Sequence, residues 1–233
     1  MAVQDDRRLF GVTGMSRLTP ADRPLPDRVT LFGMSPIEVL LVGGPSHSGK
    51  STLAEALAVK LGWSHVSTDS MARHPRRPWK TESRPVPEHV VAHYSSLSVG
   101  DLIADVMRHY NGMWPDIEGL VRPRVIDRDV DSMVLEGSAV LPERVAAAGL
   151  KDVAACWLTA NDEVLERRIH AAIGFDGATP EDKTLIQKIV SRNQRYNALI
   201  TNSVKQLGLN NIDTGNTPDV DAPVRRCVDL LES

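Results

Sequence analysis

Short apolar segments alternate with amphipathic stretches along most of the chain. Segments with the length and composition of strands in a parallel sheet lie at residues 37–42, 65–68, 132–135, 153–158 and 211–213. Apolar residues that recur every three or four positions predict helices at residues 50–61, 88–96, 98–110, 115–122, 161–172, 179–207 and about 224–231. Strands that alternate with helices indicate an α/β fold, in which a five-stranded parallel sheet is covered by helices on both faces.

Some helix boundaries carry their own signals. Ser98 precedes one predicted helix and Asp101 follows three residues later, a spacing typical of a capping box. Thr179 is followed by Pro180 and then by acidic residues, which strongly indicates a helix start. The helix at residues 115–122 is expected to end before Pro123, because proline disfavours the helical conformation of the residue before it.

A glycine-rich turn between the first strand and the first helix matches the phosphate-binding pattern G-x-x-x-x-G-K-[ST] in full. Its sequence is Gly44-Pro45-Ser46-His47-Ser48-Gly49-Lys50-Ser51. Glycines allow the backbone to curl so that successive N–H groups point at phosphate oxygens, and the helix N-terminus adds partial positive charge. Lys50 is therefore expected to reach the β- and γ-phosphates of a nucleoside triphosphate, and the Ser51 hydroxyl to ligate Mg²⁺.

The nucleotide site is expected to consist of this loop and the first turn of the helix. The residues concerned are Gly44, Ser46, His47, Ser48, Gly49, Lys50, Ser51 and Thr52. The side chain of His47 is expected to point outward, so that only its backbone belongs to the site. The expected ligands are ATP and Mg²⁺.

Several classes of protein share this loop, and other motifs distinguish them. GTPases need an N-K-x-D motif after a late strand, but residues 158–162 read L-T-A-N-D. The transporter-type signature L-S-G-G-Q and the paired acids of motor-type ATPases are also absent from the sequence. These absences favour a kinase.

Four places in the chain follow one another as in a particular group of kinases. They are the glycine-rich loop, residues 67–70 (S-T-D-S), residues 134–137 (V-L-E-G) and residues 157–169 (W-L-T-A-N-D-E-V-L-E-R-R-I). In these places the chain resembles the small P-loop kinases, which include nucleoside monophosphate, shikimate, gluconate, uridine and 2-phosphoglycerate kinases. The resemblance covers roughly residues 37–232.

The resemblance implies a three-layer P-loop fold that transfers a phosphoryl group from ATP. It also implies a helical insertion at residues 70–130 that binds the acceptor, and a short lid at residues 166–180. The segment between residues 172 and 179 departs from the pattern, since it lacks the arginine pair of monophosphate kinases. The helices after residue 88 show no acceptor signature, so the acceptor stays open.

Two acidic residues end predicted strands at the edge where such sheets bind ligands. Asp69 is the candidate base that takes the proton from an acceptor hydroxyl, and its structural alternative is a helix N-cap. Glu136 could orient a Mg²⁺-bound water or bind the acceptor, and its alternative is a salt bridge with an arginine.

Arginines supply the remaining candidates. Arg73, Arg76 and Arg77 follow Asp69 in a basic segment that clamps an anionic acceptor or is only a solvated loop. Arg167 and Arg168 lie on the lid-like helix, and one of them, with Arg168 favoured, is expected to stabilise charge on the transferring phosphoryl group, as lid arginines do in the resembling kinases. Arg192 falls near the middle of an apolar stripe on the long helix, so it is expected to bond a buried acid or to point into the cleft and bind substrate.

Composition limits the partners and the compartment. The chain has 233 residues, 42% hydrophobic and 24% charged, with a formal net charge of -3, so no strong field attracts nucleic acid or an anionic membrane. No apolar run approaches the roughly 20 residues of a membrane span. Cys156 and Cys227 lie in apolar patterns and are expected to be reduced core thiols of a cytoplasmic protein. Residues 1–36 are expected to form a proline-rich, irregular extension before the kinase domain at residues 37–233.

The sequence thus predicts a kinase that moves the γ-phosphoryl group of ATP to a hydroxyl or phosphate of a small metabolite or natural product. A nucleoside or nucleotide kinase is the alternative within enzymes, and a non-catalytic nucleotide switch is the alternative from another class. The expected partner is a small-molecule acceptor, without nucleic acid or membrane. The oligomeric state stays open, with a homodimer among the options.

Overall fold

The computed structural model describes residues 37–71, 88–127, 129–215 and 220–232. The predicted extension at residues 1–36 lies outside the described residues, and so does the basic segment with Arg73 and Arg77. The strands are β1 (Val39–Gly43), β2 (Ser64–Ser67), β3 (Met133–Glu136), β4 (Val153–Thr159) and β5 (Asn210–Asp213). The helices are α1 (Lys50–Leu61), α2 (Thr68–Met71), α3 (Glu88–Ser96), α4 (Val99–Gly112), α5 (Trp114–Ile126), α6 (Pro142–Ala148), α7 (Asp162–Ile173), the 3₁₀ helix η2 (Phe175–Gly177), α8 (Pro180–Gln206) and α9 (Asp221–Asp229).

The strands form one five-stranded sheet in the order β2-β3-β1-β4-β5, and all of its neighbouring pairs are parallel. This confirms the α/β class and the parallel sheet predicted from the sequence. In the register between β1 and β3, Val42 lies beside Glu136, and in that between β2 and β3, Ser67 lies beside Glu136. The carboxyl ends of the three strands therefore meet at one edge, where a parallel sheet of this kind binds its ligands.

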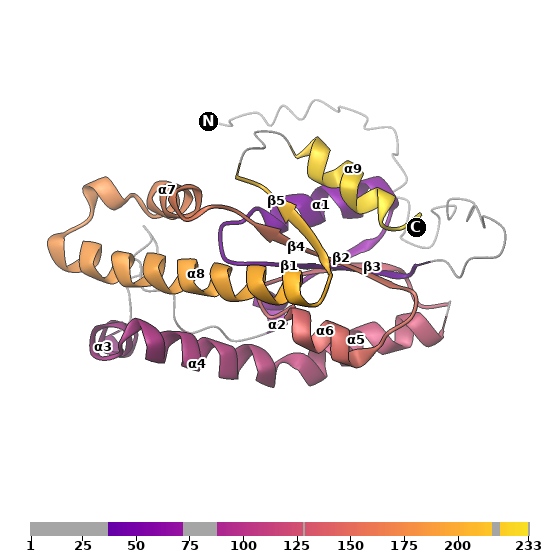
Figure 1. Ribbon diagram of the computed structural model, residues 1–233, viewed down its shortest axis with the longest axis horizontal. Coiled ribbons are helices and arrows are strands. Elements are labelled where there is room, and N and C mark those ends of the chain that lie inside the picture. The colour runs from indigo at the N-terminus through magenta and orange to yellow at the C-terminus, as the bar shows by residue number, and fades with distance from the viewer. Residues whose placement is uncertain (1–36, 72–87, 128, 216–219, 233) are drawn as a thin grey trace, which may run out of the picture. The chain divides into compact units, whose positions relative to one another are not determined.

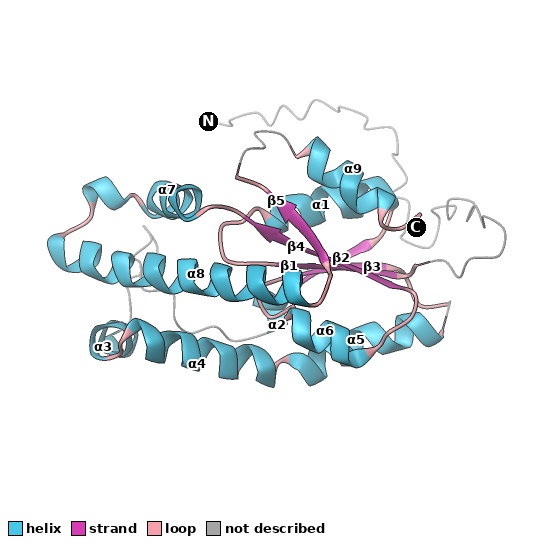
Figure 2. Cartoon of the chain, in the orientation of Figure 1, coloured by secondary structure: helices cyan, strands magenta, loops and turns pink. Residues whose placement is uncertain are grey.

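Helices cover both faces of the sheet (Figures 1 and 2). Successive side chains of a strand point to opposite faces, so Val39 and Leu41 enter one core and Leu40 and Val42 enter the other. The first core is closed by apolar residues of α4, α5 and α8, and the second by residues of α1 and α9. The alternation explains why nearly every residue of the central strands is apolar.

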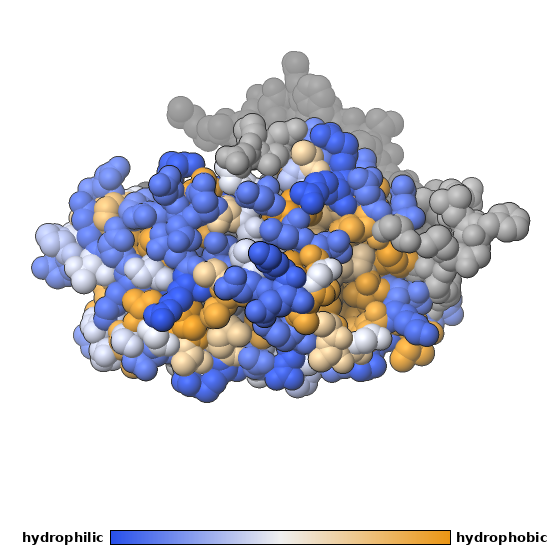
Figure 3. All heavy atoms as spheres, in the orientation of Figure 1, coloured by the Kyte–Doolittle hydropathy of each residue, from blue (hydrophilic) through white to orange (hydrophobic). Residues whose placement is uncertain are grey.

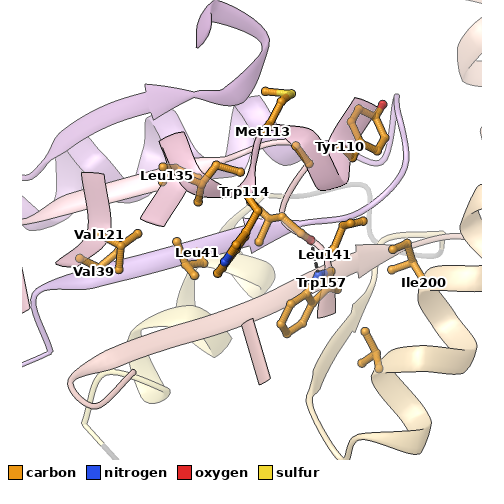
Figure 4. Close-up of a cluster of buried hydrophobic side chains, with 14 of the residues drawn as sticks. Val39, Leu41, Tyr110, Met113, Trp114, Val121, Leu135, Leu141, Trp157 and Ile200 are labelled. Carbon is orange, nitrogen blue, oxygen red and sulfur yellow. Dashed lines mark hydrogen bonds between the residues drawn. The ribbon is translucent and has the colours of Figure 1, made fainter. Parts of the chain in front are cut away.

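Two tryptophans fill the first core (Figure 4). Trp114 lies beside Leu41, and Trp157 lies close to Leu141. The Trp157 ring is fully buried, and its Nε1 atom donates a hydrogen bond to the Val140 carbonyl over 2.8 Å. The ring therefore combines apolar packing with a satisfied polar atom, as a buried tryptophan requires.

The two cysteines lie together in the second core. Cys156 of β4 and Cys227 of α9 are buried and not bonded as a disulfide, with their Sγ atoms 3.5 Å apart. Both are packed among the apolar residues that α1 and α9 place on the sheet.

The structure contains three short helices that were not predicted, α2, α6 and η2, and α5 ends later than predicted. Helix α6 was not predicted, because it is short and follows Glu136 after only a few residues. Helix α5 does not stop before Pro123 as expected but continues to Ile126. There the Arg124 guanidinium donates hydrogen bonds to the carbonyls of Leu120 and Asp131, which ties the last turn in place after the proline has removed one backbone donor.

Polar residues dominate the outer surfaces of α7 and α8 in Figure 3, while apolar side chains show between α8 and α4. A small core beneath the surface, formed by Val90, Tyr94, Leu102, Leu185 and Ile189, joins α3, α4 and α8. Within the described residues, no helix has both the length and the apolar character needed to cross a membrane.

Gly44, directly after β1, is a position where only glycine fits. Its φ is +130°, and a Cβ atom there would lie 2.2 Å from the Leu158 carbonyl oxygen. We therefore expect Gly44→Ala to lower the free energy of unfolding by about 2 kcal/mol or more. Gly119, inside α5, has no atom within 4 Å of such a Cβ, so Gly119→Ala is expected to stabilise by about 0.5–1 kcal/mol. Urea unfolding of both variants tests this, and equal stabilities would contradict it.

Candidate active site

A cavity of about 490 Å³ lies where β1 and β3 end. Its volume is within the usual range for a small-molecule site. Ten of its lining residues were predicted from the sequence: Ser46, His47, Ser48, Gly49, Lys50, Ser51, Thr52, Asp69, Glu136 and Arg168. Others were not predicted, namely Leu53, Gly137, Ser138, Leu158, Thr214, Val220 and Pro223. Gly44 does not line the cavity, since it packs behind the loop against Leu158.

The loop between β1 and α1 is curled and leads directly into the helix. Gly49 is the N-cap of α1 with a φ of 96°, and no side chain caps the first turn. The first backbone N–H groups of a helix have no acceptor within the helix, so the start of α1 is suited to bind an anion. Lys50 is buried, and its Nζ atom donates a 2.7 Å hydrogen bond to the Pro45 carbonyl.

Glu136 faces the first turn of α1. It is only 3% exposed, and its Oε1 atom accepts a 3.2 Å hydrogen bond from the Ser51 hydroxyl. Within the described residues, no arginine forms an ion pair with Glu136, so its expected structural alternative is not observed. A hydroxyl beside a carboxylate is a set of oxygen donors that suits Mg²⁺, which typically takes one or two carboxylates together with substrate phosphates.

Asp69 lies in the first turn of α2 and lines the same cavity. Its backbone N–H donates to the Ser67 hydroxyl, so Ser67, not Asp69, acts as the cap of this short helix. The close approach of α2 to the end of β3 depends on Gly137, because a Cβ atom there would lie 1.7 Å from the Thr68 hydroxyl. Asp69, just after β2, and Glu136, at the end of β3, thus lie at the carboxyl ends of adjacent strands.

The environment of Lys50 opposes its charge. Burial lowers the pKa of Lys50 below its ordinary value of 10.5, and the nearby carboxylates of Glu136 and Asp69 offset part of this effect. The ammonium group is held where water solvates it poorly. Phosphate oxygens in the cavity would supply the counter-charge that solvent does not.

Arg168 joins the loop to the end of β5. Its Nη2 atom donates to the Thr214 carbonyl over 2.8 Å, and its Nη1 atom donates to the Thr214 hydroxyl over 3.2 Å and to the His47 carbonyl over 3.4 Å. The Thr214 hydroxyl lies 3.0 Å from the Ser48 carbonyl. Burial, together with the neighbouring Arg167, lowers the pKa of Arg168, which Asp213 partly offsets. Thr214 was missed, although a polar residue just after a strand at this edge is a usable signal.

Arg192 contacts helix α3 in the structure. Its Nη1 atom donates to the Tyr94 hydroxyl over 2.7 Å. Among the described residues, Arg192 is not part of the cavity lining and forms no ion pair with an acid. The predicted apolar stripe on α8 is correct at Leu185, Ile189 and Tyr196, which are buried, but Leu199 is 41% exposed. Asn193, which lay outside the predicted stripe, is 2% exposed. Asn193 binds the loop at Ser46 and was missed, because an asparagine on a helix gives no pattern in the sequence.

Comparison with known proteins gives similarity in structure but not in sequence. No model of a protein family matches the chain, and no curated protein matches it either. Solved structures of small-molecule kinases do match. A gluconokinase from Sinorhizobium meliloti 1021 has a TM-score of 0.46 at 17% identity, with 84% of this chain and 92% of that chain covered. A shikimate kinase from Bacteroides thetaiotaomicron has a TM-score of 0.43 at 18% identity, with 84% and 98% covered. A deoxyadenosine kinase from M. mycoides has a TM-score of 0.45 at 13% identity, with 84% of this chain and 100% of that chain covered.

The buried charge of Lys50 is expected to lower the stability of the unliganded protein, although the same charge is expected to bind phosphate. Lys50→Met keeps the length of the side chain and removes the charge, so we expect the unliganded protein to gain about 0.5–2 kcal/mol of stability at neutral pH. Because the folded state lowers the pKa, it binds the Lys50 proton less tightly than the unfolded chain does. The stability of the wild type should therefore rise as the pH rises through the lowered pKa towards 10.5, and its difference from Lys50→Met should shrink.

Unfolding curves of both proteins at several pH values measure this difference. Lys60→Met is the matched control, since Lys60 is exposed on the same helix. A Lys50→Met protein that is less stable than the wild type at neutral pH would contradict the expectation.

Proposed function

We propose that the chain is an ATP- and Mg²⁺-dependent kinase that phosphorylates a hydroxyl or phosphate group of a small metabolite or natural product. The observation that carries the proposal is the shared cavity of Lys50, Ser51, Asp69 and Glu136. Phosphoryl transfer depends on positioning and on neutralising charge, and these four side chains meet both needs. The free, buried thiols of Cys156 and Cys227 are compatible with a cytoplasmic location.

In this proposal the loop and the start of α1 hold the phosphates of ATP. The backbone N–H groups at the helix start bind phosphate oxygens, and the Lys50 ammonium, already directed along the loop, moves to the β- and γ-phosphates. Ser51 and Glu136 are the residues that would hold Mg²⁺, either directly or through water. Bound there, Mg²⁺ would supply charge neutralisation between the β- and γ-phosphates.

Asp69 is proposed as the base that accepts the proton of the acceptor hydroxyl. It lines the cavity and lies close enough to Lys50 to act on its charge. Arg168 lines the same cavity and holds Thr214 through its Nη atoms, so in this proposal it adds positive charge beside the nucleotide. Arg73, Arg77 and Arg192 stay predictions for contacts with the acceptor.

A nucleotide switch without catalysis is the alternative from another class. It would bind Mg·ATP tightly without turnover that depends on an acceptor. An Asp69 side chain turned away from the loop would favour this alternative, whereas Asp69 lines the cavity. That position supports an enzyme.

The first functional prediction concerns Asp69. Wild-type protein is incubated with ATP, Mg²⁺ and a panel of metabolites, sugars and nucleosides, and ADP release is measured. We expect an acceptor-dependent rate, which Asp69→Asn reduces by about 10²-fold or more while ATP affinity is kept. Asp229→Asn, at an exposed position of α9, is the matched control and should keep the full rate. An undiminished rate in Asp69→Asn would remove Asp69 from the mechanism.

The second functional prediction concerns Glu136. Glu136→Gln can still accept a hydrogen bond from Ser51 but has lost the negative charge. We expect the Mg²⁺ concentration that gives half of the maximal rate to rise by about 10-fold or more. Glu118→Gln, which breaks only an ion pair with Arg122 on α5, should leave the Mg²⁺ dependence unchanged. A titration that gives the same midpoint for Glu136→Gln and wild type would exclude Glu136 as a group that holds the metal.

A further inference from the structure

The amide side chain of Asn193 binds both backbone polar groups of Ser46. Its Oδ1 atom accepts a 3.0 Å hydrogen bond from the Ser46 N–H, and its Nδ2 atom donates a 3.0 Å hydrogen bond to the Ser46 carbonyl. Asn193 lies on α8, 147 residues away in the sequence, and is 2% exposed. This pairing has the form of one rung of a β-ladder, made here by a side chain in the middle of a helix.

The pairing sets the direction of the next peptide group. A trans peptide is planar, so its C=O and N–H bonds point in opposite directions. When the Ser46 carbonyl points at α8, the His47 N–H points away from α8. His47 itself has a φ of 62°, a left-handed conformation that is unfavourable for a residue other than glycine unless its surroundings hold it. Asn193 supplies such a hold on the residue just before it.

The pairing also removes one loop amide, that of Ser46, from those that can bind phosphate. The Ser46 N–H is occupied by Asn193, so the expected cradle for phosphate begins at His47 and not at Ser46. The Pro45 carbonyl accepts from Lys50 Nζ over 2.7 Å and from the Ser48 N–H over 3.4 Å, which closes the loop on its other side. The peptide between Ser46 and His47 is thus oriented from α8, outside the loop's own bonds.

We propose that Asn193 is a positioning residue for phosphate binding, which holds the peptide between Ser46 and His47 in the orientation that directs the loop amides towards the nucleotide. The proposal rests on the proposed nucleotide site. Asn193 does not line the cavity and would touch neither ATP nor the acceptor, so it acts through Ser46 alone.

The same helix offers a matched control. Asn197 lies one turn further along α8, is also buried, and donates from Nδ2 to the Ala160 carbonyl over 2.8 Å. Replacing either asparagine by aspartate keeps the shape, removes one donor to a backbone carbonyl and adds the same charge. Only Asn193 is bonded to the loop.

The test compares Asn193→Asp, Asn197→Asp and the wild type by calorimetric titration with Mg·ATP at pH 8 and pH 6. We expect Asn193→Asp to bind about 10-fold or more weakly than wild type at pH 8, because a carboxylate oxygen then faces the Ser46 carbonyl. At pH 6 the ratio should move towards one, since a protonated carboxyl group again donates to that carbonyl. Asn197→Asp should bind within about 2-fold of wild type at both pH values.

Asn193→Ser removes the pairing without adding a charge. It therefore tests whether misfolding or charge repulsion alone explains the weaker binding of Asn193→Asp. Circular dichroism first establishes that each variant is folded, and a folded Asn193→Ser should bind more weakly than wild type at both pH values with a constant ratio. Equal affinities of folded Asn193→Ser and wild type, or an Asn193→Asp ratio that does not change with pH, would overturn the proposal. If the wild type itself gives no binding heat with Mg·ATP, the proposed function fails first.

Discussion

The parallel pairing of β1 with β3 is the constraint on which the site depends. Val42 lies beside Glu136 in this register, so β3 ends level with the start of the loop. Side chains alternate along a strand, and Glu136 therefore points to the same face as Val134, which is the face covered by α1. A slip of one residue would turn Glu136 to the opposite face, away from Ser51. The apolar residues that fill both cores make such a slip costly, so the packing of the sheet positions the carboxylate.

Helix α8 holds the segments that surround the carboxyl ends of β1 and β3. Lys188 donates to three carbonyls at the end of α3, those of Tyr94, Ser95 and Leu97. Further along, Asn193 binds Ser46, and the Tyr196 hydroxyl donates to the Ser138 carbonyl after β3. One helix thus bonds to the loop after β1, the turn after β3 and the end of α3 in the predicted acceptor region. Loops that are fixed to a rigid helix keep a site in register better than loops that support one another.

Local signals in the sequence predicted much of this architecture, and long-range contacts account for what they missed. The caps at Ser98 and Thr179 formed where their spacing indicated, because a cap needs only its own first turn. The glycine-rich turn, likewise local, leads into a helix at Lys50. Not every buried position of α8 could be predicted, since α8 is covered on several sides by α3, α4, α6 and α7 and its polar Asn193 is buried. Thr214 and Asn193 act through carbonyls far away in the sequence, which no spacing records.

The charges around the cavity bear on why a divalent cation belongs to the proposed reaction. Among the described lining residues, the ammonium of Lys50 and the guanidinium of Arg168 are matched by the carboxylates of Asp69 and Glu136. This balance leaves no surplus positive charge for a triphosphate, and the partial charge of the α1 N-terminus covers only a fraction of it. A cation held by Ser51 and Glu136 would turn one of the two carboxylates from a repulsive neighbour of the phosphates into a ligand. In the proposed reaction a metal would therefore serve nucleotide binding as well as phosphoryl transfer.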